Sequence, residues 1–273
     1  MAITNFIPTI WSENLYTRLD EQYIGVKHCN RDFEGEIKNL GSVVKICQLD
    51  KITAAPYTKN TDMSIPQNLS DTYTDLNIDQ AEYFNFQIDD IDRAQCTPKL
   101  MDAAMRTAAN ALAKSADKYV YGLYEGAGTT IDVTSTAADE ILDAIISARQ
   151  KLFENNVLDT SSIVVEVSPA IASVLLKAKI STSSDNFQSL ENGCIGSICG
   201  CKVFVSNNVV VENGMHKCFV RTNRAIAFAE QISEISAYRP EKRFADAVKG
   251  LHLYGAAVVV PEELVVLNIK TSA

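Results

Sequence analysis

The sequence predicts an α+β protein, and two observations carry that prediction. One is a run of about 28 residues from Thr97 with no helix breaker before a cluster of glycines, which predicts one long helix. The other is a series of apolar, β-branched segments on both sides of this run, which are typical of strands. The clearest of these are IVVEV at 163–167 and AAVVVPEELVVLNI at 256–269.

Composition sets the limits within which the elements are interpreted. The chain has 273 residues, of which 47% are hydrophobic and 22% charged, as is ordinary for a globular protein. The formal net charge is −9 and basic residues form no run longer than scattered pairs, which argues against gripping nucleic acid but not against enclosing it. The sequence shows no signal peptide and no membrane-spanning run, so we expect no membrane partner.

The N-terminal part of the chain predicts a short helix, a projecting hairpin and a strand. Residues 10–24 carry Trp11 and Leu15 at helical spacing, and so short an amphipathic helix must dock on another element. Residues 51–78 are polar and contain two prolines, as a projecting arm does, and the alternating segments VVKICQL at 43–49 and TYTDLNI at 72–78 indicate the two limbs of a projecting hairpin. Residues 82–91 alternate apolar and polar side chains, as a half-buried strand does.

The long helix begins at Thr97-Pro98, a favourable N-cap followed by a proline at the first helical position, and is expected to end near Gly126. One face of it is small and rich in alanine, which would let another backbone approach closely. This face comprises Leu100, Ala104, Thr107, Ala108, Ala111, Leu112, Ser115 and Tyr119.

Residues 131–227 are expected to form an α+β unit of their own. Thr136 is placed to cap a helix with an apolar stripe, and Ser168-Pro169 begins a second, shorter helix. IVVEV is a buried strand by its β-branched run, and Asn213-Gly214 marks a tight hairpin between two later strands.

The C-terminal part is predicted to return to the long helix. Residues 241–255 are expected to form a short helix or turn that leads into a strand, and residues 256–269 a strand, a turn and a second strand. Fully apolar strands need cover on both faces, and the long helix has no other assigned partner. We therefore expect the closing strands to pack on that helix, so that residues 131–227 are an insertion in a discontinuous domain.

No complete catalytic or metal-binding motif is present. The three histidines fit no metalloprotease pattern, and neither a nucleophile elbow nor a phosphate-binding glycine loop is complete. Cys194, Cys199 and Cys201 lack the spacing of a zinc site and are expected to be ordinary reduced thiols. We expect no enzymatic activity, no cofactor and no metal.

Two local patterns and the order of the elements resemble a known family. The patterns are GCIGSICGCKVFVSNNV, followed soon by AIAFAEQ, and KGLHLYGAAVVVPEELVVL. With the long helix between a projecting hairpin and the inserted unit, they resemble tailed-bacteriophage major capsid proteins of the Hong Kong ninety-seven type over nearly the whole chain. The resemblance implies an N-terminal arm at 1–30, an E-loop with its flanking strands at 31–82, a P-domain at 83–130 with the spine helix at about 97–125, an A-domain at 131–227 and the closing P-domain strands at 228–273.

The resemblance implies a structural protein that self-assembles as hexamers and pentamers into an icosahedral head around double-stranded DNA. It further implies a separate scaffolding protein, a portal, head-decoration proteins, assembly in the host cytoplasm and a final place in the virion. The residues that it suggests for contacts between subunits are Trp11, Lys51, Tyr57, Lys59, Met63, Arg239 and Arg243. Arg239 and Arg243 would face acidic residues of a neighbour, or would be ordinary surface charges.

Two alternatives are open at this point. Encapsulins, cellular shells that hold enzyme cargo, share the same fold. A protein of another class, a cytosolic α+β enzyme, would use the Cys194 thiol, with His216 as its base, or the Asp90 carboxylate. The acidic cluster of Asp89, Asp90 and Asp92 is otherwise expected to be a solvated strand end.

Overall fold

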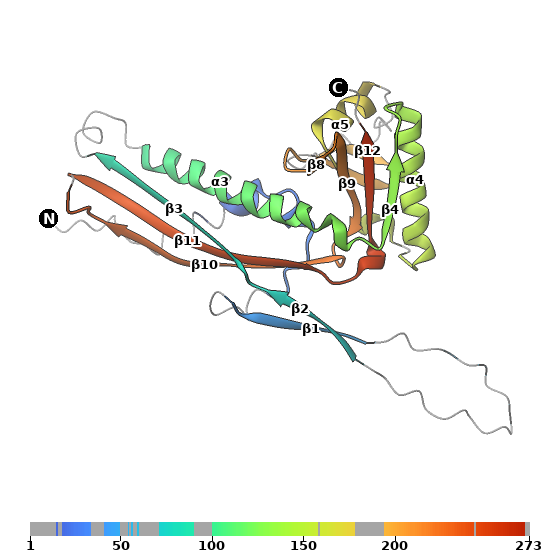
Figure 1. Ribbon diagram of the computed structural model, residues 1–273, viewed down its shortest axis with the longest axis horizontal. Helices are drawn as coiled ribbons and strands as arrows, with labels where there is room; N and C mark the ends of the chain where they lie inside the picture. Colours follow the sequence, from blue (N-terminus) through green and yellow to red (C-terminus); the bar gives the residue numbers. More distant parts are fainter. Residues whose placement is uncertain are drawn as a thin grey trace.

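A computed structural model describes residues 15, 18–33, 41–49, 54, 56, 59, 71–89, 100–157, 159–177, 194–242 and 244–270. The subunit consists of a long sheet with one helix along it, a compact lobe at one end of the sheet, and a two-stranded hairpin that projects from the side of the sheet opposite the lobe (Figure 1). We call the long sheet and its helix the plate. No helix in the described ranges is long and apolar enough to cross a membrane.

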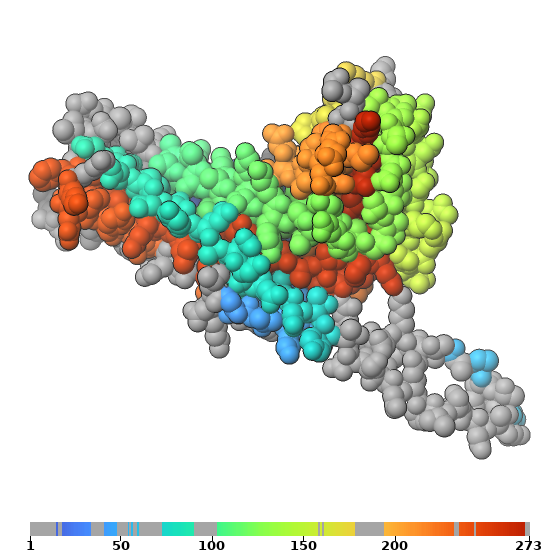
Figure 2. All heavy atoms as spheres, viewed as in Figure 1, coloured from blue at the N-terminus to red at the C-terminus, as the bar shows by residue number. Residues whose placement is uncertain are grey.

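The plate contains three antiparallel strands in the order β10-β11-β3 and the helix α3. These elements are β3 (Gln80–Asp89), α3 (Leu100–Gly122), β10 (Ile226–Tyr238) and β11 (Ala245–Val258). Inward and outward residues alternate along β3, and Phe84 and Phe86 pack against the core, as the alternation in the sequence predicts. Figure 2 shows α3 lying lengthwise over the strands of the plate.

The lobe is built on a seven-stranded mixed sheet in the order β4-β12-β9-β5-β7-β6, with the short β8 beside β9. Two helices, α4 and α5, accompany it, and α4 packs on β4 and β12. The bounds are β4 (Thr129–Val133), α4 (Ala138–Glu154), β5 (Ile163–Val167), α5 (Pro169–Lys177), β6 (Cys194–Ile198), β7 (Cys201–Val205), β8 (Val211–Glu212), β9 (Met215–Thr222) and β12 (Leu264–Lys270).

Several predictions for the lobe are confirmed. Every residue of β5 is buried, as the β-branched run indicates, and α5 begins at the predicted Pro169. Asn213 and Gly214 both have positive φ, as a two-residue hairpin turn between β8 and β9 requires. Thr136 does not cap α4: the helix begins one residue later than that cap requires, with Ala137 at the N-cap and no side-chain cap bond.

The projecting hairpin is formed by β1 (Val43–Leu49) and β2 (Asp71–Asn77), paired antiparallel from Val43 opposite Asn77 to Leu49 opposite Asp71. The two predicted limbs are therefore confirmed. One face of the hairpin is buried against the plate; its cluster comprises Val44, Ile46, Leu76, Ile78, Ala227, Ala229 and Leu253. Most of the predicted tip, at 51–70, lies outside the described residues.

One prediction for the C-terminal part is confirmed in one of its two forms, and another is wrong. Of the two forms offered for residues 241–255, the turn that leads into a strand is confirmed and the helix is wrong: Glu241 and Lys242 lie in a turn, and residues 245–255 belong to the 14-residue strand β11, which hydrogen-bonds β10 on one side and β3 on the other. The second closing strand, β12, does not pack on the long helix but lies inside the lobe sheet, between β4 and β9. The turn at Pro261–Glu263 therefore carries the chain from the plate into the lobe.

The long helix is confirmed over residues 100–122 and is followed by a 3₁₀ turn at Leu123–Gly126, while its predicted start at Thr97-Pro98 lies outside the described residues. Among the members of the predicted face whose side chains the structure describes, Leu112 is buried and Thr107 and Ala111 are exposed. The others, Ala104, Ala108, Ser115 and Tyr119, are half-buried, so the alanine-rich face is not the most buried one. The observed face is rotated toward the lobe and the N-terminal segment, and it includes a buried carboxylate at Asp117. Its apolar members are Met105, Ala109, Leu112, Ala113, Ala116, Val120 and Tyr121.

Candidate functional site

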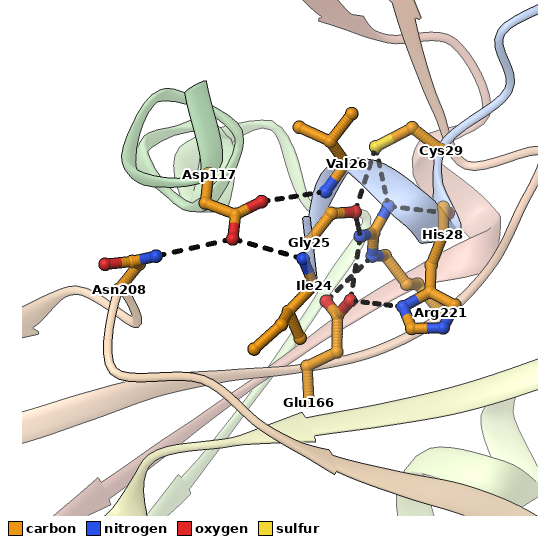
Figure 3. Close-up of polar contacts among 9 residues, drawn as sticks. All are labelled: Ile24, Gly25, Val26, His28, Cys29, Asp117, Glu166, Asn208 and Arg221. Atoms are coloured by element: carbon orange, nitrogen blue, oxygen red, sulfur yellow. Dashed lines mark hydrogen bonds and ion pairs between the residues drawn. The ribbon is translucent and has the colours of Figure 1, made fainter. Parts of the chain in front are cut away.

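The most polar part of the core lies where the plate meets the lobe. Residues 18–33, which we call the strap, run through this corner, and Leu19 and Tyr23 are buried there as the helical spacing at 10–24 suggests. Residues 18–22 of the strap are α-helical, within the predicted helix at 10–24, and Val26–His28 form a 3₁₀ turn. Buried charged side chains from the lobe and the plate hold its backbone (Figure 3).

Asp117 of α3 binds two main-chain amides of the strap. Its Oδ1 accepts a hydrogen bond from Val26 N–H at 3.0 Å, and its Oδ2 accepts one from Ile24 N–H at 3.2 Å. The Asn208 amide nitrogen, from the lobe, donates to Oδ2 at 3.3 Å. Because Asp117 is 1% exposed, these three donors take the place of the water that its carboxylate would otherwise bind.

Arg221 of β9 binds the carbonyls of the same stretch. One guanidinium nitrogen donates to Gly25 O at 2.6 Å, and the other donates to His28 O at 3.0 Å and to Cys29 Sγ at 3.2 Å. Asp117 thus accepts from the amides of the strap, and Arg221 donates to its carbonyls. Between the two, Gly25 lies against the Tyr121 ring, where an added Cβ would be 3.1 Å from ring carbons.

Glu166 of β5 balances the charge of Arg221. Its two carboxylate oxygens accept from Arg221 Nε and from a terminal nitrogen, each at 3.0 Å, in a two-point pair that solvent does not reach. His28 Nδ1 lies 3.0 Å from the same carboxylate, and its ring packs on Phe204 with centroids 4.3 Å apart. Bidentate geometry and a third partner are what a buried ion pair needs to offset its desolvation.

A second buried carboxylate, Glu230 of β10, fastens the strap to the plate. The Tyr23 hydroxyl donates to it, Arg31 donates at 2.6 Å, and His252 Nε2 lies 2.9 Å away. The strap also adds a short parallel bridge to β10, in which Asn30 N–H donates to Ile226 O and Asn30 O accepts from Phe228 N–H, each at 2.8 Å.

The environment shifts the pKa values of these groups in different directions. Burial raises the pKa of Asp117 to about 6, against the lowering effect of the Val26 and Ile24 amides. Burial also acts to raise the pKa of Glu166, but Arg221 and His28 together hold that pKa below its ordinary value. Burial raises the pKa of the Cys29 thiol, so that it stays protonated beside the guanidinium.

Outside this corner, large apolar side chains are exposed on the hairpin and on the plate. Tyr73 is 58% exposed and Val43 51% on the outer face of the hairpin, whereas the opposite face is buried. On the plate, Tyr83 is 78% exposed and Phe244 84%.

Comparisons with known proteins agree with this architecture. A family model described as phage capsid protein matches residues 73–267, which is most of the chain. The chain belongs to the phage capsid protein family. No curated protein matches the sequence.

Solved phage structures share the fold. A chain from Mycobacterium phage Che8 is 30% identical, with a TM-score of 0.70 over 90% of this chain and 91% of that one. The capsid of Ralstonia phage GP4 gives 0.69 at 12% identity, over 93% and 91% of the two chains. The capsid of Cyanophage P-SCSP1u gives 0.67 at 14% identity, over 90% and 87%. These last two show the fold alone.

The capsid family settles the function class. The protein is a structural major capsid protein of the tailed-phage type, which assembles into oligomers and belongs to the virion. The same matches do not favour the encapsulin alternative.

The structure places only two of the predicted contact residues of this capsid protein. Lys59 is exposed in a turn, and Arg239 is 61% exposed on its side chain, with Nε 3.5 Å from Asp246 of the same chain. The other five lie outside the described residues: Trp11, Lys51, Tyr57, Met63 and Arg243.

The residues of the enzyme alternative are not brought together. Cys194 lies on β6 and His216 on β9, with β7 and β5 between them in the sheet. Asp90 and Asp92 lie outside the described residues, and the part of the chain that the structure does describe holds no cluster of three metal-ligating side chains.

Sequence reasoning missed the strap cluster altogether. Glu166 stands inside the apolar run IVVEV, and Arg221 follows the apolar residues of HKCFVRT. A charge inside a strand that is buried on both faces needs a partner, and that signal was available. The sequence does not show which residue is the partner, since 55 residues separate Glu166 from Arg221.

Proposed function

We propose that the capsid protein assembles as hexamers and pentamers that close into an icosahedral head around double-stranded DNA. In this proposal the projecting hairpin is the E-loop, the plate is the P-domain and the lobe is the A-domain, with the strap at the base of the N-terminal arm. The family match and the arrangement of plate, lobe and hairpin in Figure 1 support it.

The hairpin is the observation that carries the proposal. Its inner face is fixed to β10 and β11, while Tyr73 and Val43 face outward, with Lys45 Nζ 4.7 Å from the Tyr73 ring centroid. A two-stranded ribbon gains little stability by itself in water. The exposure of Val43 and Tyr73 on such a ribbon is explained if a neighbouring subunit covers them.

The remaining partners follow from the family and from charge. A net charge of −9 suits a shell wall that encloses DNA without holding it tightly or by sequence. A separate scaffolding protein, a portal and head-decoration proteins complete the proposed assembly, which takes place in the host cytoplasm. Neither catalysis nor a cofactor is part of the proposal.

The experiment is sedimentation and negative-stain microscopy of the purified chain, with and without co-expressed neighbouring genes. Closed particles, or rings of five and six subunits, are expected. A chain that sediments as a monomer in both preparations contradicts the proposal, whereas particles only in the co-expressed sample identify a requirement for a helper such as a scaffold.

The proposed contact at Arg239 and Arg243 has its own test. Replacing both by glutamate is expected to block assembly while the subunit stays folded, because reversed charges repel the acidic neighbour. Arg224→Glu is the matched control, since Arg224 is also exposed and pairs with Glu263 of its own chain at 3.8 Å. Normal shells from the double variant would remove this contact from the proposal.

A further inference from the structure

The chain crosses between the plate and the lobe at three places that lie together. These crossings are 126–129, between α3 and β4; 222–226, between β9 and β10; and 258–264, between β11 and β12. Main-chain hydrogen bonds tie them to one another: Gly128 N–H donates to Pro261 O at 2.9 Å, and Val259 N–H to Ala225 O at 2.9 Å. The relative orientation of plate and lobe is decided at this corner.

The strap is anchored on both sides of the second crossing. Arg221, which holds the Gly25 and His28 carbonyls, is the last residue but one of β9 in the lobe. Glu230, which holds Tyr23 and Arg31, stands near the start of β10 in the plate. The strap therefore joins the two strands that diverge from the turn at 223–225.

A third anchor fixes the strap from the plate's helix. Asp117 of α3 binds the Ile24 and Val26 amides together with Asn208, which belongs to the loop after β7 in the lobe. One carboxylate thus bridges the helix, the strap and the lobe. Arg221, Glu166, Asp117 and Glu230 are each at most 4% exposed, so none of these bonds competes with bulk water.

We propose that the strap is a brace that fixes the angle between lobe and plate, acting through its buried anchors on both sides of the corner. The anchors bind main-chain atoms of residues 24–28 as well as side chains of the strap, so the brace depends on both. This inference concerns the single subunit and does not rest on how subunits assemble.

Hydrogen exchange measured by mass spectrometry tests the brace in the full chain, with all variants compared in the same assembly state. Asp117→Asn keeps the shape of the side chain but replaces one carboxylate oxygen with an NH₂ group, which cannot accept the hydrogen bonds that the strap amides and Asn208 donate. If the strap braces the corner, amides at 222–230 and 258–264 exchange roughly tenfold faster together with those of residues 18–33.

A second variant loosens the strap from the plate side alone. Tyr23→Phe with Arg31→Met removes two of the partners of Glu230 and retains the ring that packs on Phe228. Lys151→Met is the control, because it removes an exposed pair with Glu154 within α4. Faster exchange in residues 18–33 with unchanged exchange at 222–230 and 258–264 in both variants would overturn the proposal, because the strap would then be bound to the corner without bracing it.

Discussion

Arg221 and Glu166 form a two-point ion pair across β9 and β5 in which both side chains are completely buried. Arg221→Met leaves the Glu166 carboxylate buried with only His28 beside it, and is expected to lower the free energy of unfolding by about 3–5 kcal/mol. Urea titration measures this loss. The double variant Glu166→Met/Arg221→Met should lose less than Arg221→Met alone, since no unpaired charge remains.

The control for this cycle is Lys151→Met, whose exposed pair with Glu154 should contribute no more than about 0.5 kcal/mol. If the double variant instead loses the sum of the two single losses, the two charges are not coupled, and the strap contacts of Arg221 account for its whole effect.

The pKa of Asp117 predicts a pH dependence with a definite sign. Its folded value of about 6 lies above its ordinary value of 3.8, so the folded state favours the protonated form. The contribution is fully present below pH 4 and is lost as the pH rises through 6, a decrease of about 2 kcal/mol between pH 4 and pH 7.

Urea titrations across this range, for the wild type and for Asp117→Asn, measure the effect as a difference. The lowered pKa of Glu166 makes stability rise with pH, which is the opposite dependence. Because both proteins contain Glu166, its contribution cancels in the difference between them. A difference between the two proteins that does not change from pH 4 to pH 7 would show that Asp117 has the same pKa folded and unfolded.

Gly255 sets the position of the hairpin on the plate. A Cβ at this residue would lie 2.1 Å from the Asn77 carbonyl oxygen, so Gly255→Ala must displace the base of β2. Thermal unfolding is expected to show a loss of about 1–3 kcal/mol. Gly122→Ala is the matched control, because that glycine is at the end of α3 with open space around it, and alanine there is expected to be neutral or slightly stabilising.

The outer face of the hairpin separates assembly from folding. Tyr73→Ser should leave the unfolding free energy within about 0.5 kcal/mol, because its ring is already exposed, yet reduce the yield of particles. Sedimentation and thermal unfolding measure the two quantities. Leu176→Ser, at an exposed apolar residue of α5, is the control; an equal loss of particles in both variants would show that the hairpin has no special part in assembly.

Local sequence patterns predicted the elements better than their partners. The long helix, the hairpin limbs, the buried strand IVVEV and the turn at Asn213-Gly214 each follow from a few adjacent residues, and the structure contains all of them. β11 was only partly predicted: its segment mixes charged residues with glycine and alanine, which left a short helix open as an alternative to a turn and a strand. Its pairing with β10 and β3 on both sides outweighs those weak local preferences.

The strap cluster shows what a single sequence leaves undetermined. Glu166 and Arg221 are brought together by the antiparallel register of β5 and β9, in which Val164 stands opposite Arg221. Asp117 meets the strap because α3 turns a different face inward from the one that the alanine spacing suggested. Both contacts depend on tertiary packing, so no local rule would have found them.

The position of β12 restricts when the lobe can form during synthesis. β4, at 129–133, is parallel to β12, at 264–270, and β12 is its neighbour in the sheet. The ribosome must therefore synthesise more than a hundred residues after β4 before β4 can pair with β12. Until then β4 is unpaired and β9 is left as an open edge, so a nascent chain interrupted before residue 264 cannot complete the lobe sheet.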